Sequence, residues 1–157
     1  MNKYLSLAAL TGAVTASTCP TFETQKNIDG SRYVGNWFEI TRDADFIFEL
    51  GSQCSTAHYT PNQKGNIDVV NRSWALYYGA NYFALKGEAK PHLEEGNLTV
   101  GFFGASIEGD ANYNILFTDY DNAIVYDCAP GPLGTIVEQM WILSRENTMS
   151  DEKLAFL

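Results

Sequence analysis

The sequence predicts an all-β fold of eight antiparallel strands, either closed into an up-and-down barrel or split into a two-sheet sandwich. Strand-forming runs recur about every 10 to 15 residues along the whole chain. Clusters of Gly, Pro, Asn and Asp separate them, as in short turns. Both faces of these runs carry apolar side chains. We favour the barrel, because closure removes exposed sheet edges and leaves room for a cavity inside.

Eight runs make up the expected barrel. They cover residues 36–44, 52–60, 66–73, 81–89, 97–103, 112–119, 122–128 and 136–145. The turn-forming stretches between them are 61–65, 78–80, 91–96, 104–110, 121–122 and 129–134. The chain has 157 residues and no internal repeat, so one continuous domain is the simplest arrangement.

The last run shows most clearly why we favour a barrel. Strand alternation puts five of its side chains on one face: Val137, Gln139, Trp141, Leu143 and Arg145. The opposite face is also largely apolar. Such a strand lines a partly apolar interior and meets apolar surface outside.

One late segment is predicted to be helical. Ser150 is a suitable N-cap, and Asp151 and Glu152 lie where the helix dipole favours negative charge. The chain ends at Leu157, a few residues into this segment.

The first 16 residues are predicted to be a signal peptide that is removed on secretion. Lys3 precedes the mostly apolar run 4–14, and small residues follow at Val14-Thr15-Ala16. A membrane-spanning helix needs about 20 apolar residues, so this run is too short. A buried first helix is the alternative. A lipid-anchored Cys19 fits less well, because Thr18 precedes it. The barrel domain is therefore expected to span 17–157 in an extracellular protein.

Charge and composition exclude several function classes. The net charge is −9, which disfavours binding to nucleic acid or to an anionic membrane. The two histidines, His58 and His92, do not form a zinc-binding pattern. No phosphate-binding loop or nucleophile elbow is present. We therefore expect no metal, no cofactor and no catalytic residues.

Three short motifs indicate a family. They are Gly35-Asn36-Trp37-Phe38-Glu39-Ile40, Thr118-Asp119-Tyr120 and Trp141-Ile142-Leu143-Ser144-Arg145. In this order, with eight strands around them, they resemble the three conserved regions of the lipocalins. Within that family, the stretches Val100-Gly101-Phe102-Phe103-Gly104 and Trp141 to Arg145 are most similar to the apolipoprotein D and bacterial outer-membrane lipocalin group.

The resemblance implies that the three motifs meet at the closed end of the barrel. Trp37 would plug this base, and the Arg145 guanidinium would pack across its indole ring. Thr118, Asp119 and Tyr120 would form the turn between the sixth and seventh strands, close to Gly35. These roles are structural.

Function is then expected to come from the cavity. Trp141 has the same strand parity as Arg145, so we expect it to point inward. Other candidate ligand-binding residues are Tyr59, Ile67, Val69, Asn71 and Phe102. The resemblance implies an extracellular carrier for a small hydrophobic or amphiphilic ligand, such as a fatty acid, lysophospholipid, steroid or retinoid. The alternatives are an isomerase-like enzyme that uses Cys54 as a cavity thiol, and a surface interaction protein whose barrel Trp141 helps to fill.

The resemblance also implies a long final helix followed by a ninth strand, so we expect the helix that ends at Leu157 to be truncated and the ninth strand to be missing. It further implies a disulfide between Cys19 and Cys128. It leaves Cys54 either free or without a partner that lay beyond Leu157. Asn97-Leu98-Thr99 and Asn71-Arg72-Ser73 are glycosylation sequons. We expect Asn97, after a turn, to be the modified one. The sequence does not indicate an oligomeric state.

Overall fold

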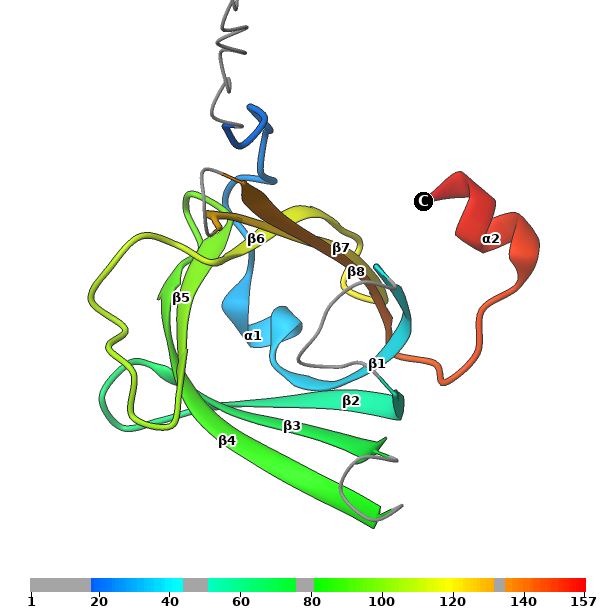
Figure 1. Cartoon of the computed structure of the whole chain (residues 1–157), viewed down its shortest axis with the longest axis horizontal. Helices are drawn as coiled ribbons and strands as arrows, with labels where there is room; N and C mark the ends of the chain where they lie inside the picture. Colours follow the sequence, from blue (N-terminus) through cyan, green and yellow to red (C-terminus); the bar gives the residue numbers. More distant parts are fainter. Residues whose placement is uncertain (1–17, 44–50, 76–80, 132–134) are drawn as a thin grey trace, which may run out of the picture.

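The protein is a closed barrel of eight antiparallel strands (Figure 1), which confirms the predicted fold class. The structure is a computed structural model and describes residues 18–43, 51–75, 81–131 and 135–157. The predicted signal peptide, 1–16, lies outside these residues.

The strands follow the predicted order with small shifts at their ends. They are β1 Gly35–Arg42, β2 Ser52–Pro61, β3 Ile67–Ala75, β4 Asn81–His92, β5 Asn97–Phe102, β6 Tyr113–Thr118, β7 Asn122–Pro130 and β8 Ile136–Ser144. The largest difference is in β4, which runs three residues beyond its predicted end. Pro91 and His92 pair with Leu98 and Asn97, so the turn expected from 91 begins only after His92.

Each strand pairs with its neighbours in the sequence, and β1 pairs with β8 to close the barrel. The β1–β8 seam contains a register shift between Glu39 and Thr41. A β-bulge of this kind bends a strand, as barrel closure requires. The β5–β6 seam pairs only at Asn97↔Asn114 and Leu98↔Tyr113.

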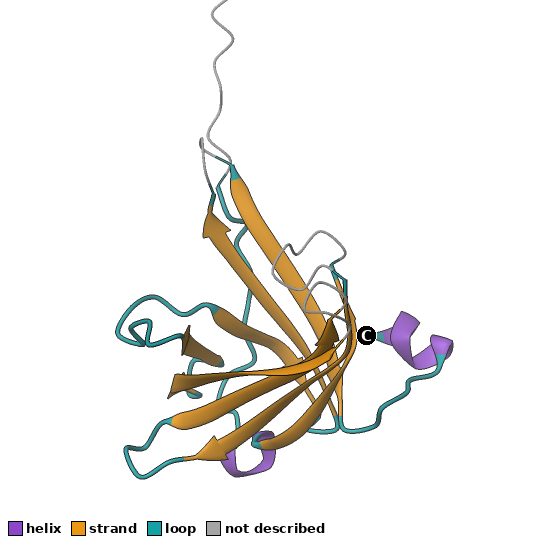
Figure 2. Cartoon of the chain, turned by 60° about the horizontal axis from the view of Figure 1, so that its bottom comes forward, coloured by secondary structure: helices purple, strands orange, loops and turns teal. Residues whose placement is uncertain are grey.

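A short helix, α1 (Gly30–Tyr33), precedes the first strand. No helix was predicted at this position, so α1 is an addition to the expected elements. Asp29 caps α1 by accepting a hydrogen bond from the Ser31 amide at 2.9 Å. A single turn is too short to produce a helical hydrophobic period, so the sequence pattern missed it. Figure 2 shows α1 at one end of the barrel.

The predicted late helix is α2 (Asp151–Phe156), with Ser150 as its N-cap as expected. It has no buried residues and lies outside the barrel (Figures 1 and 2).

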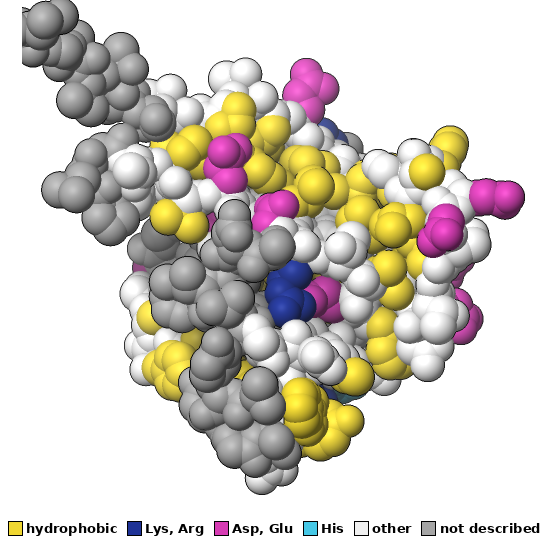
Figure 3. All heavy atoms as spheres, turned by 45° about the vertical axis from the view of Figure 1, so that its right-hand side comes forward, with side chains coloured by type: hydrophobic (Ala, Val, Ile, Leu, Met, Phe, Trp, Pro, Cys, Tyr) yellow, Lys and Arg dark blue, Asp and Glu magenta, His cyan; other side chains and the backbone are white. Residues whose placement is uncertain are grey.

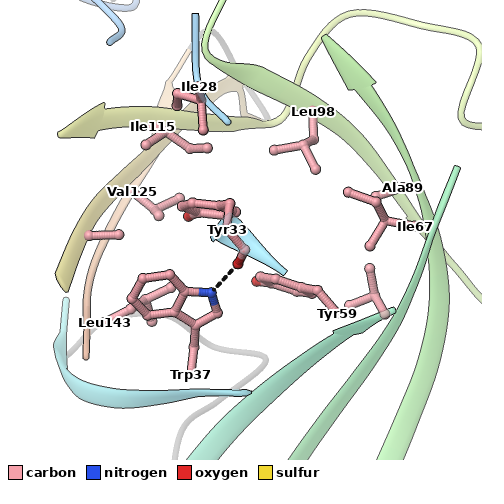
Figure 4. Close-up of a cluster of buried hydrophobic side chains, with 12 residues drawn as sticks. Ile28, Tyr33, Trp37, Tyr59, Ile67, Ala89, Leu98, Ile115, Val125 and Leu143 are labelled. Atoms are coloured by element: carbon pink, nitrogen blue, oxygen red, sulfur yellow. Dashed lines mark hydrogen bonds between the residues drawn. The ribbon is translucent and has the colours of Figure 1, made fainter. Parts of the chain in front are cut away.

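The buried core gathers around α1 and the first half of β1. Its largest fully buried side chains are Trp37 and Tyr33, and Figure 4 shows them beside Tyr59. The Trp37 indole N–H donates to the Tyr33 carbonyl at 2.8 Å. This contact fixes α1 beneath the strands.

Candidate ligand cavity

The base of the barrel is closed by Trp37 and Arg145. Trp37 has no exposed surface. The guanidinium carbon of Arg145 lies 3.7 Å from the centre of the Trp37 ring. A cation–π contact of this kind contributes about 0.5–2 kcal/mol. The stacking predicted for these two residues is present.

Arg145 also satisfies the backbone carbonyl groups around the base. Its guanidinium donates hydrogen bonds to the carbonyl oxygens of Arg32, Tyr33, Val34, Asn36 and Tyr120. Gly35 lies inside this group of carbonyls with φ +100°, a conformation that other residues rarely adopt. The Gly-x-Trp motif therefore places both the backbone and the indole around one guanidinium.

The Thr118-Asp119-Tyr120 motif forms the β6–β7 turn, as predicted. The Asp119 carboxylate accepts hydrogen bonds from the backbone N–H groups of Asp121 and Asn122, at 2.9 and 2.6 Å. It also accepts hydrogen bonds from the side-chain amide of Asn122. The Thr118 hydroxyl donates to the Asn122 carbonyl at 2.8 Å. Partial burial raises the pKa of Asp119, but the hydrogen bonds from Asn122 outweigh it, so the pKa is lowered.

Above the base lies a cavity of about 370 Å³. Most of its wall is aliphatic or aromatic. The non-polar side chains on it are Ala57, Tyr59, Val69, Phe83, Leu85, Ala89, Leu98, Val100, Phe102, Phe103, Tyr113, Trp141 and Leu143. Five of these, namely Tyr59, Val69, Ala89, Leu98 and Leu143, also belong to the buried core and form the cavity floor.

Five of the six residues expected to bind a ligand line this cavity: Trp141, Tyr59, Val69, Asn71 and Phe102. Ile67 does not. It is buried at 6% exposure in the core cluster. Ile67 pairs with Pro61, the last residue of β2, so it lies too near the base to meet the open volume.

The sequence reasoning missed several lining residues, of which Tyr113, Leu98 and Asp127 matter most. A signal for Leu98 existed, since it has the same parity as Phe102 on β5. Tyr113 opens β6 and pairs with Leu98. The direction of its side chain could not be predicted, because the chain before it is a long irregular loop.

The charged groups of the cavity wall are Glu39, Arg72 and Asp127. Glu39 points inward with 10% of its side chain exposed, and it forms an ion pair with Arg42. Asp127 has no ion-pair partner among the described residues, and its half-burial raises the pKa of this carboxyl. Glu39 and Arg42 also line a second hollow beside the first. Figure 3 shows a basic and an acidic side chain side by side in a hollow on one face.

Cys19 and Cys128 form the predicted disulfide, with a sequence separation of 109 residues. Cys54 is free and exposed. It lines the second hollow and not the cavity above the base. The His58 ring is hydrogen-bonded to the Asn36 side chain at 2.6 Å. The bulge between Gln53 and Thr56 also interrupts the alternation that would put Cys54 and His58 on one face.

Asn97 is partly buried at the start of β5, and its modification stays a prediction. Asn71 faces the cavity. Across the described parts of the chain, no cluster of His, Cys, Asp and Glu could hold a metal ion. No helix there is long and apolar enough to cross a membrane.

Comparison with known proteins identifies the family. The profile of the lipocalin-like domain matches residues 28–157. The chain belongs to the lipocalin family. Apolipoprotein D of Bos taurus is 33% identical to this lipocalin over 160 residues, covering 97% of the chain and 82% of that protein. Outer membrane lipoprotein Blc of Citrobacter freundii is 35% identical over 161 residues, covering 93% of the chain and 81% of that protein. The resemblance to this group is thus confirmed.

Solved lipocalin-type structures agree in fold. Insecticyanin of Manduca sexta superimposes with a TM-score of 0.74 at 23% identity, covering 90% of this lipocalin and 76% of that chain. The cockroach allergen Per a 4 gives 0.68 at 22% identity, covering 88% and 82%.

Proposed function

We propose that this lipocalin is an extracellular, non-enzymatic carrier that binds one small hydrophobic or amphiphilic molecule in the barrel cavity. The observation that carries this is the cavity of about 370 Å³ above a sealed base. A barrel whose side chains filled it would be a scaffold only. Burial of a ligand against such a wall contributes about 25 cal/mol per Å² of apolar surface.

The extracellular part of the proposal is supported by the Cys19–Cys128 disulfide. Disulfides persist in oxidising compartments and are rare in the cytosol of mesophiles. The non-enzymatic part is supported by the position of Cys54, which lies outside the cavity above the base.

Two adjacent residues of β4 allow a matched test. Leu85 lines the cavity, whereas Lys86 is exposed and does not. Leu85→Trp fills part of the cavity, and Lys86→Trp adds the same side chain outside. Binding of the neutral fluorescent probe N-phenyl-1-naphthylamine should fall more than about tenfold in Leu85→Trp, equivalent to about 1.4 kcal/mol. It should be unchanged in Lys86→Trp.

Native mass spectrometry of the purified protein should also show a co-purified small molecule that Leu85→Trp loses. Equal probe binding by both variants, or no binding by the original protein, would remove the carrier proposal.

A further inference from the structure

Three tyrosines meet at the lower part of the cavity through their hydroxyl groups. The Tyr33 and Tyr113 oxygens are 2.8 Å apart, and the Tyr59 hydroxyl donates to the Tyr113 oxygen at 3.2 Å. Tyr59 and Tyr113 line the cavity, whereas Tyr33 belongs to α1 and is 1% exposed. Tyr113 is thus the central member of the cluster and faces the open volume.

The direction of the Tyr33–Tyr113 hydrogen bond follows from counting protons. A phenol has one proton to donate. In the described part of the chain, the Tyr33 hydroxyl has no acceptor other than Tyr113. A buried donor left without an acceptor costs about 1–3 kcal/mol. Tyr33 therefore donates to Tyr113, and Tyr113 accepts two hydrogen bonds.

With its oxygen accepting from both neighbours, Tyr113 keeps its own proton for another acceptor. None of the hydrogen bonds among the described residues uses that proton once Tyr33 is the donor. We infer that the Tyr113 hydroxyl is a specificity-determining hydrogen-bond donor, oriented by Tyr33, for the carbonyl oxygen of an uncharged amphiphile that enters the cavity carbonyl end first. This inference rests on the proposed carrier function and names the class of its ligand.

Charge favours a neutral acceptor over a carboxylate. Desolvation raises the pKa of both Tyr33 and Tyr113 well above the usual 10, so both phenols keep their protons at physiological pH. The same desolvation penalises a buried anion. Nearer the open end, Glu39 is paired with Arg42, Asp127 has no ion-pair partner among the described residues, and Arg72 also lines the wall. Because the opposite charges of Asp127 and Arg72 offset each other, the preference for an uncharged ligand rests on the desolvation penalty.

A second polar contact is available further up the wall. Asn71 and Ser55 line the cavity, and their buried Oδ1 and Oγ atoms have no hydrogen-bond partner among the described residues. Val69 pairs with Tyr59 near the floor, and Asn71 lies two residues further toward the open end, about 7 Å away. A hydroxyl group on the ligand, further toward the open end than its carbonyl, would satisfy Asn71.

The test compares 2-dodecanone with dodecane and with dodecanoate, each displacing N-phenyl-1-naphthylamine from the protein. A neutral hydrogen bond contributes about 1–1.5 kcal/mol, which is about 5- to 10-fold in affinity. We expect Tyr113→Phe to bind 2-dodecanone about 5- to 10-fold more weakly and dodecane equally well. Tyr82→Phe is the matched control, because Tyr82 is 68% exposed.

Infrared spectroscopy of carbonyl-labelled 2-dodecanone supplies an independent readout. The carbonyl band should lie at the lower, hydrogen-bonded frequency in the original protein and in Tyr82→Phe, and move up in Tyr113→Phe. Tyr33→Phe keeps the Tyr113 donor but removes the hydrogen bond that orients it. In this variant the carbonyl band of the ligand should therefore broaden and lie between the two frequencies. A merely structural role for Tyr33 would leave the band unchanged.

The outcomes separate this inference from the carrier proposal. If 2-dodecanone, dodecane and dodecanoate all fail to displace the probe, the carrier proposal fails. If 2-dodecanone and dodecane bind but Tyr113→Phe weakens both equally or neither, the carrier stands and the Tyr113 donor is refuted. Dodecanoate binding as tightly as 2-dodecanone would refute the preference for an uncharged ligand.

Discussion

At the base of the barrel, the Arg145 guanidinium donates to five backbone carbonyls and stacks on Trp37. In the cavity wall above it, Asn71 Oδ1 and Ser55 Oγ are buried without partners among the described residues. At the base the exception is Asn122 Oδ1, which is also buried without a partner there, although the amide nitrogen of Asn122 donates to Asp119. The two regions are neighbours in the sheet, because Asn71 on β3 pairs with Ala57 on β2, and Ala57 pairs with Trp37 on β1.

The difference separates stability from function. Polar groups that are fully satisfied in a buried site fix one structure. Buried polar atoms without partners cost free energy and persist where a ligand can supply the missing hydrogen bonds. The base, where Arg145 and Asp119 match their hydrogen-bond partners, is therefore the stabilising region, and the cavity wall carries a hydrogen-bonding capacity that a ligand can reach.

Two tryptophans give the largest expected contrast. Trp37→Ala removes a fully buried side chain from the base and should lower the free energy of unfolding by about 3–5 kcal/mol. Trp141→Ala removes a partly buried side chain that already faces a cavity, so it should cost about 1–2 kcal/mol. Urea denaturation measures both. Equal losses would contradict the division between base and cavity.

Arg145→Lys tests the base without creating a large cavity. An ammonium cannot stack on the indole or reach all five carbonyls, so we expect a loss of about 2–3 kcal/mol. Arg32→Lys is the control, because the Arg32 guanidinium also lies over a ring, that of Tyr120 at 3.8 Å, but is exposed. Its loss should stay below about 1 kcal/mol by thermal or urea denaturation.

The β6–β7 turn should give the base a pH dependence. The folded-state pKa of Asp119 is lowered, so its contribution is present above the unfolded-state pKa, about 4, and is lost as the pH falls through the folded value. Asp119→Asn should cost about 1 kcal/mol at pH 6, and this difference should shrink as the pH falls below about 4.

The exposed Asp110→Asn serves as the control for Asp119. Urea denaturation from pH 6 to pH 3 should show no such convergence for Asp110→Asn. A difference for Asp119→Asn that grows in acid would contradict the assigned hydrogen bonds.

The smallest effect has the opposite sign. Asn71→Leu replaces a cavity-lining side chain and its unpartnered oxygen with an apolar group of similar size. It should raise the free energy of unfolding by about 0.5–1 kcal/mol in the absence of ligand. Differential scanning calorimetry of ligand-free protein measures this change. Destabilisation would show that Asn71 already has a polar partner.

Much of the fold could be predicted because strand alternation and turn chemistry are local signals. All eight strands lie close to their expected ranges, and Ser150 caps α2 as expected. The helix α1 could not be predicted in this way, since one helical turn has no hydrophobic period. For the candidate site, parity placed Trp141 correctly on the inner row, but it could not tell that Ile67 lies below the open volume.

The resemblance to the lipocalins implied that the three motifs meet at the base and that Cys19 pairs with Cys128. The sequence by itself determined the positions of the strands and turns. Alternation and residue type suffice there, because each signal acts within a strand or turn. Only the tertiary structure decided that space remains above Trp37 and that Tyr33, Tyr59 and Tyr113 share their hydroxyl protons. Empty volume and hydrogen-bond direction depend on side chains from α1, β2 and β6 meeting at one point, which no local pattern encodes.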